Sequence, residues 1–343
     1  MVMDRISFEK AIELITRAGI HELGTMADEV RREKHPDDVV TYVVDTNINY
    51  TNICVSGCSF CAFYVNPGDE RGYVLSNEEL HGKIAHAEEC GATQILLQGG
   101  LHPDLKIEFY ERMLRGIKDK FNIHLHAFGP PEIQHIASVS GISTLEVLKR
   151  LKHAGLDSLP GGGAEVLADE VRESKSPRKC TSEQWLKVMR QAHSLGMKTT
   201  ATMMFGFGDR EDHRIMHLMK IRELQEETGG FTAFIAWTFQ PKNTELSHLL
   251  SPTPLEYLKI LAISRLFLDN FVNIQASWVT QGEKIGQLAL FFGANDMGGT
   301  TMEENVVRSA GCEFNTTEER VREVITRAGF IPKKRNTLYE IIE

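Results

Sequence analysis

The sequence has few cysteines, lacks any long apolar run and carries no excess of positive charge. Its 343 residues include six cysteines and give a formal net charge of −9 at pH 7. The negative balance argues against a nucleic-acid-binding surface, and no apolar run is long enough to span a membrane. Because a targeting segment is also absent and the thiols have no evident disulfide framework, we expect a reducing, cytoplasmic location.

Linker-like tracts of proline, glycine and serine are absent too, as are sequence repeats and low-complexity segments. We therefore expect a single domain overall. Residues 1–39 form an N-terminal helical extension in which apolar residues recur among polar positions. Residues 40–343 form the main body and include a C-terminal helical segment.

Short apolar runs separated by helical patterns follow the extension. The predicted strands are residues 40–44, 93–97, 123–126, 158–159, 198–204, 232–239, 274–278 and 288–292. Helical patterns in the gaps include residues 78–90, 107–119, 145–153, 182–195, 212–226 and 255–268. Continuous apolar strands that alternate with helices predict an α/β fold, a parallel (β/α)8 barrel of the TIM type with an N-terminal helical cap. A doubly wound open sheet is the alternative.

Three of the six cysteines form a Cys-x-x-x-Cys-x-x-Cys array, made of Cys54, Cys58 and Cys61. Three thiolates on one loop can bind three irons of a [4Fe–4S] cluster and leave the fourth iron open to a ligand. Zinc is the main alternative, but structural zinc sites usually pair two Cys-x-x-Cys knuckles and this chain has no second one. The array therefore predicts a cluster with an open iron.

Glycine-rich and polar residues follow the predicted strands, so they would gather at the rim where barrel enzymes place their active sites. Gly99 and Gly100 follow the second strand, where a turn is the simpler explanation for such a pair. Three glycines precede Glu165 after the fourth strand. They can serve a tight turn, Glu165 can accept hydrogen bonds from ribose hydroxyls, or both can hold.

Histidines and one tryptophan are further candidates. We expect only one of His124 and His126 to enter the barrel, and we assign His126 to the interior rim. His213 and His217 have a spacing that could bind a metal, but no acidic partner at metal-site spacing is evident, so a solvated helix face is predicted. Trp278 lies among polar residues and is a candidate for stacking on an aromatic substrate ring.

Phe60 lies in the second gap of the cysteine array, and Cys-x-x-x-Cys-x-aromatic-Cys resembles the signature of the radical S-adenosylmethionine superfamily. The resemblance implies that S-adenosylmethionine chelates the open iron and is cleaved by one electron to a 5′-deoxyadenosyl radical. It also implies that Gly99 and Gly100 bind the amino group of S-adenosylmethionine. Met204 would lie in the stretch whose backbone pairs with adenine, although residues 206–209 depart from the usual pattern there.

Nearly the whole chain resembles one branch of that superfamily, the enzymes that handle futalosine derivatives in menaquinone biosynthesis. Deazaflavin-forming synthases belong to the same branch. The stretches that carry the resemblance are residues 47–52, 97–103, 155–165, 228–234 and 293–296. Residues 128–133, 199–204 and 275–282 look like the cyclases that act on dehypoxanthine futalosine and differ from aminofutalosine synthases. Thr46 and Ala236 depart from the cyclase pattern, where arginine and proline are usual.

The resemblance to the cyclases implies a reaction. The deoxyadenosyl radical takes a hydrogen from C4′ of the substrate ribose, and the carbon radical adds to the carboxyphenyl ring. A base must then remove a proton, and we expect His126 or Asp296 to be that base because Glu165 is occupied with ribose. A reduced flavodoxin or ferredoxin is implied as electron donor. The alternatives are an aminofutalosine synthase, a deazaflavin synthase and, outside enzymes, an iron–sulfur electron carrier.

Overall fold

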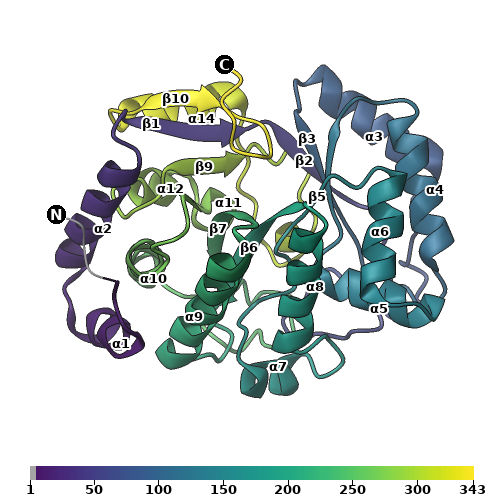
Figure 1. Cartoon of the computed structure of the whole chain (residues 1–343), viewed down its shortest axis with the longest axis horizontal. Helices are drawn as coiled ribbons and strands as arrows, with labels where there is room; N and C mark the ends of the chain where they lie inside the picture. Colours follow the sequence, from purple (N-terminus) through teal and green to yellow (C-terminus); the bar gives the residue numbers. More distant parts are fainter. Residues whose placement is uncertain (1–4) are drawn as a thin grey trace.

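The structure is a computed structural model that describes residues 5–343. In this part of the chain, ten parallel strands form one curled sheet with helices around its outside (Figure 1). The sheet order is β10-β1-β9-β8-β7-β6-β5-β4-β3-β2. β1 (Val39–Val43) and β2 (Asp45–Asn49) are two parts of one extended stretch, since only Val44 separates them. β1 pairs with β9 and β10 whereas β2 pairs with β3, so this split strand brings the two ends of the sheet together.

The barrel-type α/β fold is confirmed, and most predicted strands overlap an observed one. The further strands are β3 (Gln94–Gln98), β4 (His124–Ala127), β5 (Ser158–Leu159), β6 (Lys198–Phe205), β7 (Phe231–Thr238), β8 (Asn273–Gln275), β9 (Asp296–Gly299) and β10 (Ile331–Lys334). The strand predicted at residues 288–292 is wrong, because this apolar run is the end of a helix and a turn. The observed strand, β9, has the sequence Asp-Met-Gly-Gly, which contains no β-branched or aromatic residue.

The helices lie mostly on the outside of the sheet. They are α1 (Phe8–Arg17), α2 (Ile20–Lys34), α3 (Asn77–Glu89), α4 (Ile107–Lys118), α5 (Pro130–Ser140), α6 (Thr144–Ala154), α7 (Asp169–Lys175), α8 (Ser182–Ser194), α9 (Glu211–Thr228), α10 (Pro254–Phe267), α11 (Trp278–Gln281), α12 (Glu283–Ala289), α13 (Val306–Ser309) and α14 (Glu318–Arg327). In the N-terminal extension, extended backbone at Gly19 separates α1 from α2. α1 packs on α9 and α2 packs on α10. Within residues 5–343, no helix combines the length and apolar composition that a membrane span requires.

The prediction of a solvated face at His213 and His217 is wrong. Both side chains are buried, and Nδ1 of His217 accepts a hydrogen bond from the backbone N–H of Leu167 at 3.1 Å. The segment after β5 therefore covers this part of α9. A charged or polar helix pattern alone does not show which other segments pack over it.

A buried ion pair joins the C-terminal strand to the barrel. Arg335, just after β10, donates to both carboxylate oxygens of Asp296, with Nε–Oδ2 at 2.5 Å and Nη2–Oδ1 at 3.0 Å. The hydroxyl of Thr41 in β1 and the backbone N–H of Gly298 also donate to this carboxylate. The Asp296 side chain has no exposed surface. Removing its charge would leave a buried guanidinium without its carboxylate partner.

We expect Asp296→Ala to lower the free energy of unfolding by about 3–5 kcal/mol, because it breaks a buried charge pair from one side. Urea denaturation followed by circular dichroism measures this change. The matched control is Glu29→Ala on the exposed face of α2, for which we expect a change within about 0.5 kcal/mol. Equal stability of Asp296→Ala and the wild-type protein would show that other contacts hold Arg335 in place.

Candidate active site

A cavity of about 450 Å³ occupies the barrel and reaches the rim formed by the carboxyl ends of the strands. Its wall combines the inward faces of several strands with the loops that follow them. The predicted site residues that line it are Cys54, Cys58, Cys61, Gly99, Gly100, His126, Glu165 and Met204. The structure thus brings together residues that are up to 150 positions apart, from Cys54 to Met204. Asp296 is the one predicted site residue that does not line the cavity.

The cysteine loop follows β2 and forms part of the cavity wall. Cys58 is buried, and Cys54 and Cys61 are partly exposed. The backbone N–H of Cys61 donates to the carbonyl of Cys58 at 3.1 Å, which makes a tight turn between them. Burial raises the pKa of the Cys58 thiol to about 11 and also raises the pKa of Cys61. Binding to iron must therefore displace protons from these thiols, as metal binding to cysteine generally does.

The arrangement of the three cysteines fits a cluster better than a single ion. All six cysteines of the chain are free thiols, so none of the three is tied up in a disulfide. Among the described residues, no three histidine, cysteine or acidic side chains come close enough together to hold one metal ion. A [4Fe–4S] cube does not need such convergence, because each thiolate binds a different iron.

Gly99 and Gly100 pack against the start of the cysteine loop. A Cβ atom at Gly99 would lie 2.6 Å from the ring of Tyr50, and one at Gly100 would lie 2.3 Å from the carbonyl oxygen of Ile53. The backbone N–H of Gly100 donates to the carbonyl of Thr51 at 2.9 Å. The pair is therefore required by close backbone packing, and it also exposes main-chain groups to the cavity next to the cysteines.

Glu132, in the first turn of α5, supports this glycine pair. Its Oε1 accepts hydrogen bonds from the backbone N–H of Gly99 at 3.1 Å and from the hydroxyl of Tyr50 at 2.7 Å. Its Oε2 accepts from the backbone N–H of Gly129 at 2.8 Å. Burial raises the pKa of Glu132 to about 7, although these donors favour the charged form. Sequence reasoning missed Glu132, although Pro130-Pro131-Glu132 is a typical helix start.

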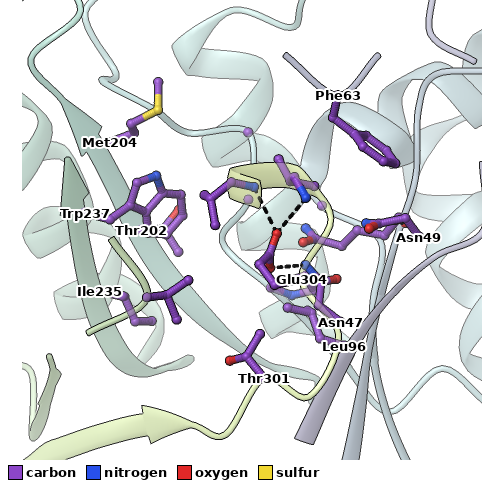
Figure 2. A pocket seen from close by; sticks show the side chains of 18 of the residues that line it. Asn47, Asn49, Phe63, Leu96, Thr202, Met204, Ile235, Trp237, Thr301 and Glu304 are labelled. Carbon is purple, nitrogen blue, oxygen red and sulfur yellow. Dashed lines mark hydrogen bonds between the residues drawn. The ribbon is translucent and has the colours of Figure 1, made fainter. Parts of the chain in front are cut away.

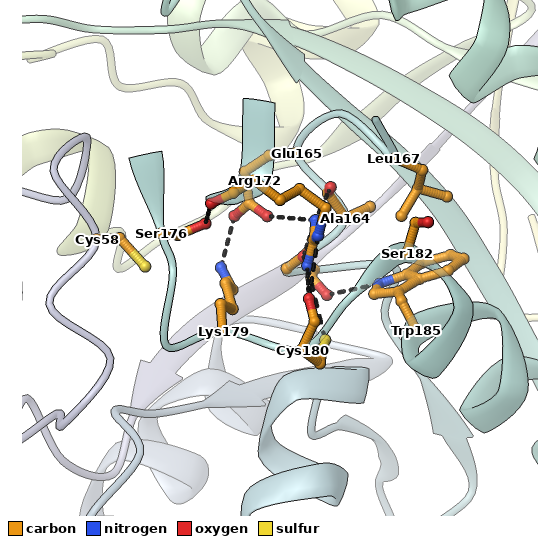
Figure 3. Close-up of polar contacts among 12 residues, drawn as sticks. Cys58, Ala164, Glu165, Leu167, Arg172, Ser176, Lys179, Cys180, Ser182 and Trp185 are labelled. Atoms are coloured by element: carbon orange, nitrogen blue, oxygen red, sulfur yellow. Dashed lines mark hydrogen bonds and ion pairs between the residues drawn. The ribbon is translucent and has the colours of Figure 1, made fainter. Parts of the chain in front are cut away.

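Glu165 lies at the rim between two cations (Figure 3). Its backbone has a φ of 41°, a left-handed conformation that is unusual for a residue with a side chain. Oε1 accepts a hydrogen bond from Nζ of Lys179 at 2.7 Å, and Nη1 of Arg172 lies 3.8 Å from Oε2. Within residues 5–343, Oε2 has no hydrogen-bond partner although it is buried. One oxygen of this carboxylate is therefore left to accept a hydrogen bond from a bound ligand.

Arg172 and Lys179 hold the loop around Glu165. Arg172 donates to the backbone carbonyls of Ala164 and Cys180, at 2.6 and 2.5 Å. Nζ of Lys179 lies 5.4 Å from the centre of the Phe60 ring in the cysteine loop. Nearby carboxylate and thiol groups raise the pKa of Lys179 despite its burial, so it stays charged. The two cations therefore fix the loop and place a positive charge beside the cysteines.

Met204 lies near the end of β6 and its side chain lines the cavity (Figure 2). Its backbone N–H already donates to the carbonyl of Glu165 at 3.1 Å. The loop after β6 is closed by Asp209, whose Oδ1 accepts from the backbone N–H groups of Gly206 and Phe207. Residues 206–209 do not line the cavity, so their departure from the family pattern leaves the cavity wall unaffected.

His126 lies in β4 and lines the cavity. Burial lowers its pKa to about 3, so the imidazole is neutral near pH 7. His126 lines the cavity and His124 does not, but both contact the hydroxyl of Ser158, so the two side chains do not point to opposite faces of the strand. Residues two apart in a strand share a face. Asp296 does not line the cavity, and its oxygens are taken by Arg335 and other donors, so the structure does not support it as a base.

The inner part of the cavity has a polar wall and an apolar wall. Figure 2 shows Asn47, Asn49 and Glu304 on one side, opposite Met204 and Trp237. Nδ2 of Asn47 donates to Glu304 at 2.7 Å, and Nδ2 of Asn49 donates to the carbonyl of Gln98. In the described part of the chain, the Oδ1 atoms of both asparagines lack hydrogen-bond partners. The sequence did not reveal this wall because polar β2 does not look like a strand.

Of three other residues named from the sequence, one lines the cavity and two do not. Trp278 lines the cavity, and its Nε1 donates to the carbonyl of Gly299 at 3.0 Å. Thr46 and Ala236 are buried but do not line it. Their departure from the cyclase pattern therefore does not alter the cavity wall directly.

Comparison with known proteins gives two family matches. Residues 48–221 match the model of the radical SAM superfamily. Residues 228–343 match the model described as the CofH/MqnC C-terminal region. The first match spans the cysteine loop, the glycine pair and Glu165. The second spans β7 to β10 and the loop that carries Glu304.

Curated relatives match along nearly the full length. A protein of Halalkalibacterium halodurans called cyclic dehypoxanthine futalosine synthase is 47% identical over 99% of this chain and 92% of its own length. A protein of Archaeoglobus fulgidus called 5-amino-6-(D-ribitylamino)uracil–L-tyrosine 4-hydroxyphenyl transferase is 45% identical over 94% of each chain.

Solved structures agree on the fold. The crystal structure of methylornithine synthase (PylB) aligns with a TM-score of 0.73 at 17% identity and covers 96% of this chain and 94% of its own. The cysteine loop at the rim, the two family matches and the full-length relatives lead to one conclusion. The chain belongs to the radical SAM superfamily, whose members use a [4Fe–4S] cluster and S-adenosylmethionine, and within it to the CofH/MqnC group.

Proposed function

We propose that the protein is a radical SAM cyclase that converts dehypoxanthine futalosine to cyclic dehypoxanthine futalosine in menaquinone biosynthesis. The observation that carries the proposal is the 47% identity, over nearly the whole chain, to a relative with that name. A second candidate is transfer of a hydroxyphenyl group to a ribitylaminouracil, because a transferase of that name is 45% identical. The two reactions differ in substrate, so turnover separates them.

In this proposal, Cys54, Cys58 and Cys61 hold the cluster and the rim of the cavity takes S-adenosylmethionine. When bound, these groups supply a 5′-deoxyadenosyl radical that removes a hydrogen atom from the substrate. The chain's own task is to position the two ligands and keep water away. The curled sheet and the rim loops surround much of the cavity and so limit the contact of water with a carbon radical.

The rim offers complementary groups for S-adenosylmethionine. Main-chain groups at Gly99 and Gly100 suit an amino group, and Glu132 fixes their orientation by accepting the Gly99 N–H. The unpartnered oxygen of Glu165 suits a ribose hydroxyl. The backbone N–H of Met204 is already used, and its side chain lines the cavity, where it can contact adenine.

The inner cavity suits a substrate that is polar at one end and aromatic at the other. The unpartnered oxygens of Asn47 and Asn49, with the carboxylate of Glu304, form a wall of hydrogen-bond acceptors that fits sugar hydroxyls. Trp237 and Trp278 line the cavity with large apolar surfaces that fit a carboxyphenyl ring. Each amide nitrogen donates a hydrogen bond, Asn47 to Glu304 and Asn49 to the carbonyl of Gln98. Rotating either amide would break that bond, so the positions of the two Oδ1 atoms are fixed.

His126 is the base in this proposal. It is buried, neutral and lines the cavity, so its ring can take the proton that leaves the substrate ring. A small reduced flavodoxin or ferredoxin is proposed as electron donor. The three cysteines line the cavity near its rim, so such a donor would approach the cluster from the side of the cysteine loop. A cytoplasmic location belongs to the same proposal.

We expect the reconstituted protein, incubated anaerobically with dithionite, S-adenosylmethionine and dehypoxanthine futalosine, to form 5′-deoxyadenosine and a product lighter than the substrate by two hydrogens. One hydrogen atom goes to the deoxyadenosyl radical and the second leaves as a proton. Mass spectrometry measures both products. Turnover only with tyrosine and the ribitylaminouracil would select the transferase, and an intact cluster that forms no deoxyadenosine would select an electron carrier.

We expect His126→Ala to cleave S-adenosylmethionine but to lower the yield of cyclised product per deoxyadenosine by about 100-fold or more, as loss of a general base does. The measurement is the ratio of the two products by mass spectrometry. An unchanged ratio would remove His126 from the mechanism.

We expect Glu132 to make stability depend on pH. Burial raises its pKa from 4.5 to about 7, so the folded protein keeps a proton that the unfolded chain loses between these values. Stability relative to Glu132→Gln should therefore rise as the pH falls from about 7 to about 4.5, by on the order of 3 kcal/mol. Urea unfolding across this range measures the difference, with the exposed Glu78→Gln as control. A pH-independent difference would contradict the raised pKa.

A further inference from the structure

The proposed base His126 belongs to a group of polar side chains whose other members the reaction described so far does not use. The hydroxyl of Ser158, at the start of β5, lies between two imidazoles of β4. Its Oγ is 2.6 Å from Nδ1 of His126 and 2.7 Å from Nε2 of His124. His126 lines the cavity, while His124 and Ser158 do not. The three side chains therefore form a continuous hydrogen-bonded row that leads away from the cavity.

We propose that His126, Ser158 and His124 form a proton relay that carries the proton released in the cavity to the amino-terminal end of the barrel. The proposal rests on the proposed function, in which His126 takes that proton. Ser158 and His124 act through His126 and are positioning residues for proton transfer, since neither touches the cavity.

Outward proton transfer requires one direction of the hydrogen bonds in the row, and the neighbours of His126 allow that direction. The hydroxyl of Thr200 accepts the backbone N–H of Gly161 at 3.0 Å, so its own hydrogen is free to point at Nε2 of His126, 3.5 Å away. In the proposed relay, Nε2 is the acceptor nitrogen and Nδ1 carries the hydrogen. Nδ1 donates to Ser158, whose hydroxyl in turn donates to Nε2 of His124. Every hydrogen in the row therefore points outward, which is the arrangement that outward transfer needs.

Both imidazoles are neutral in the resting protein. Burial lowers the pKa of His126 to about 3 and also lowers the pKa of His124. The charged groups around them are Arg335, which disfavours a second positive charge at His126, and the pair Asp157 and Lys118 beside His124. A neutral imidazole can accept a proton on one nitrogen and release one from the other, which a charged imidazole cannot do.

The outer end of the row reaches the surface region. His124 is partly exposed, whereas Ser158 and His126 are buried. Asp157 next to it is about one-third exposed and accepts hydrogen bonds from Lys118 and from the backbone N–H of Leu125. A proton that arrives at His124 is thus favoured by a nearby carboxylate and can pass to water.

The number of protons balances when each proton is followed along the row. The C–H bond of the substrate ring breaks, and its proton binds Nε2 of His126. The Nδ1 proton of His126 moves to Ser158, and the hydroxyl proton of Ser158 moves to Nε2 of His124. Ser158 ends with one proton, as it began. The electron that the ring loses passes to a one-electron acceptor of the small redox-protein class.

A bridging hydroxyl could also serve packing alone, and the chain offers a comparison. His193 is likewise held between two hydroxyls, with Nδ1 2.7 Å from Thr228 and Nε2 2.8 Å from Thr199. His193 does not line the cavity. It therefore matches the two hydroxyl contacts of His126, to Ser158 and Thr200, without any connection to the reaction.

The experiment uses the full chain with reconstituted cluster, S-adenosylmethionine and dehypoxanthine futalosine. The variants are Ser158→Ala, which interrupts the row, and His124→Gln, which keeps a hydrogen-bond acceptor but cannot take a proton. We expect both to form deoxyadenosine within about twofold of wild type and to lower the cyclised product per deoxyadenosine by about tenfold or more. KM for the substrate should stay unchanged, because neither residue lines the cavity. Ser158→Thr, which keeps the hydroxyl, should restore the ratio.

His193→Gln is the matched control and should leave both the ratio and KM at wild-type values. A wild-type product ratio in Ser158→Ala and His124→Gln would overturn the relay. An equal loss in His193→Gln would also overturn it, since the effect would then follow from lost packing. If Ser158→Ala does not fold, the product ratio of His124→Gln, a substitution at a partly exposed position, decides whether the relay operates. Absence of cyclised product from the wild-type protein would instead refute the proposed function, and the relay with it.

Discussion

The cavity depends on the way one extended stretch near the N-terminus closes the sheet. β1 and β2 are separated by Val44 alone, yet they pair with strands from opposite ends of the sheet order. This pairing turns an open sheet into an enclosure, and it gives the inward faces of the strands a common interior. The cysteine loop begins where β2 ends, so the same stretch that closes the barrel also sets the position of the proposed cluster relative to the cavity.

The interior is unusual for a barrel because one part of its wall is polar. The inward face of β2 carries Asp45, Asn47 and Asn49, where a packed barrel would carry branched apolar residues. Such residues are stable inside only when they are hydrogen-bonded, and several oxygens here are not. The unsatisfied oxygens face a cavity rather than packed side chains, so a bound ligand can satisfy them.

The sequence predicted the elements whose pattern reflects burial on both faces. Strands such as β3 and β6 and amphipathic helices such as α4 were found because apolar residues mark them. β2 and β9 were missed because they are polar or glycine-rich, and they are strands only because their neighbours in the sheet pair with them. The strand placed at residues 288–292 shows the reverse error, since an apolar run there ends a helix.

The site was predicted in a similar way. The cysteines, the glycine pair, His126, Glu165 and Met204 line one cavity because each follows or ends a strand of a parallel sheet. Asp296 was expected after a strand but begins β9, and its partner Arg335 follows a strand that no pattern predicted. Glu132 and Glu304 were missed because their roles depend on distant backbone N–H and side-chain groups that only the folded chain brings together.

The strand pairs that close the barrel affect how the chain folds during its synthesis. Thr41 and Asp296 hydrogen-bond across 255 positions of sequence, so the first strand cannot find its place until most of the polypeptide has been made. During synthesis the cysteine loop is made early, before the strands that later enclose it. Contacts this distant form slowly and leave strand edges exposed meanwhile. The thiols are therefore exposed to the surrounding solution, with its oxidants and metal carriers, before the interior of the barrel has formed.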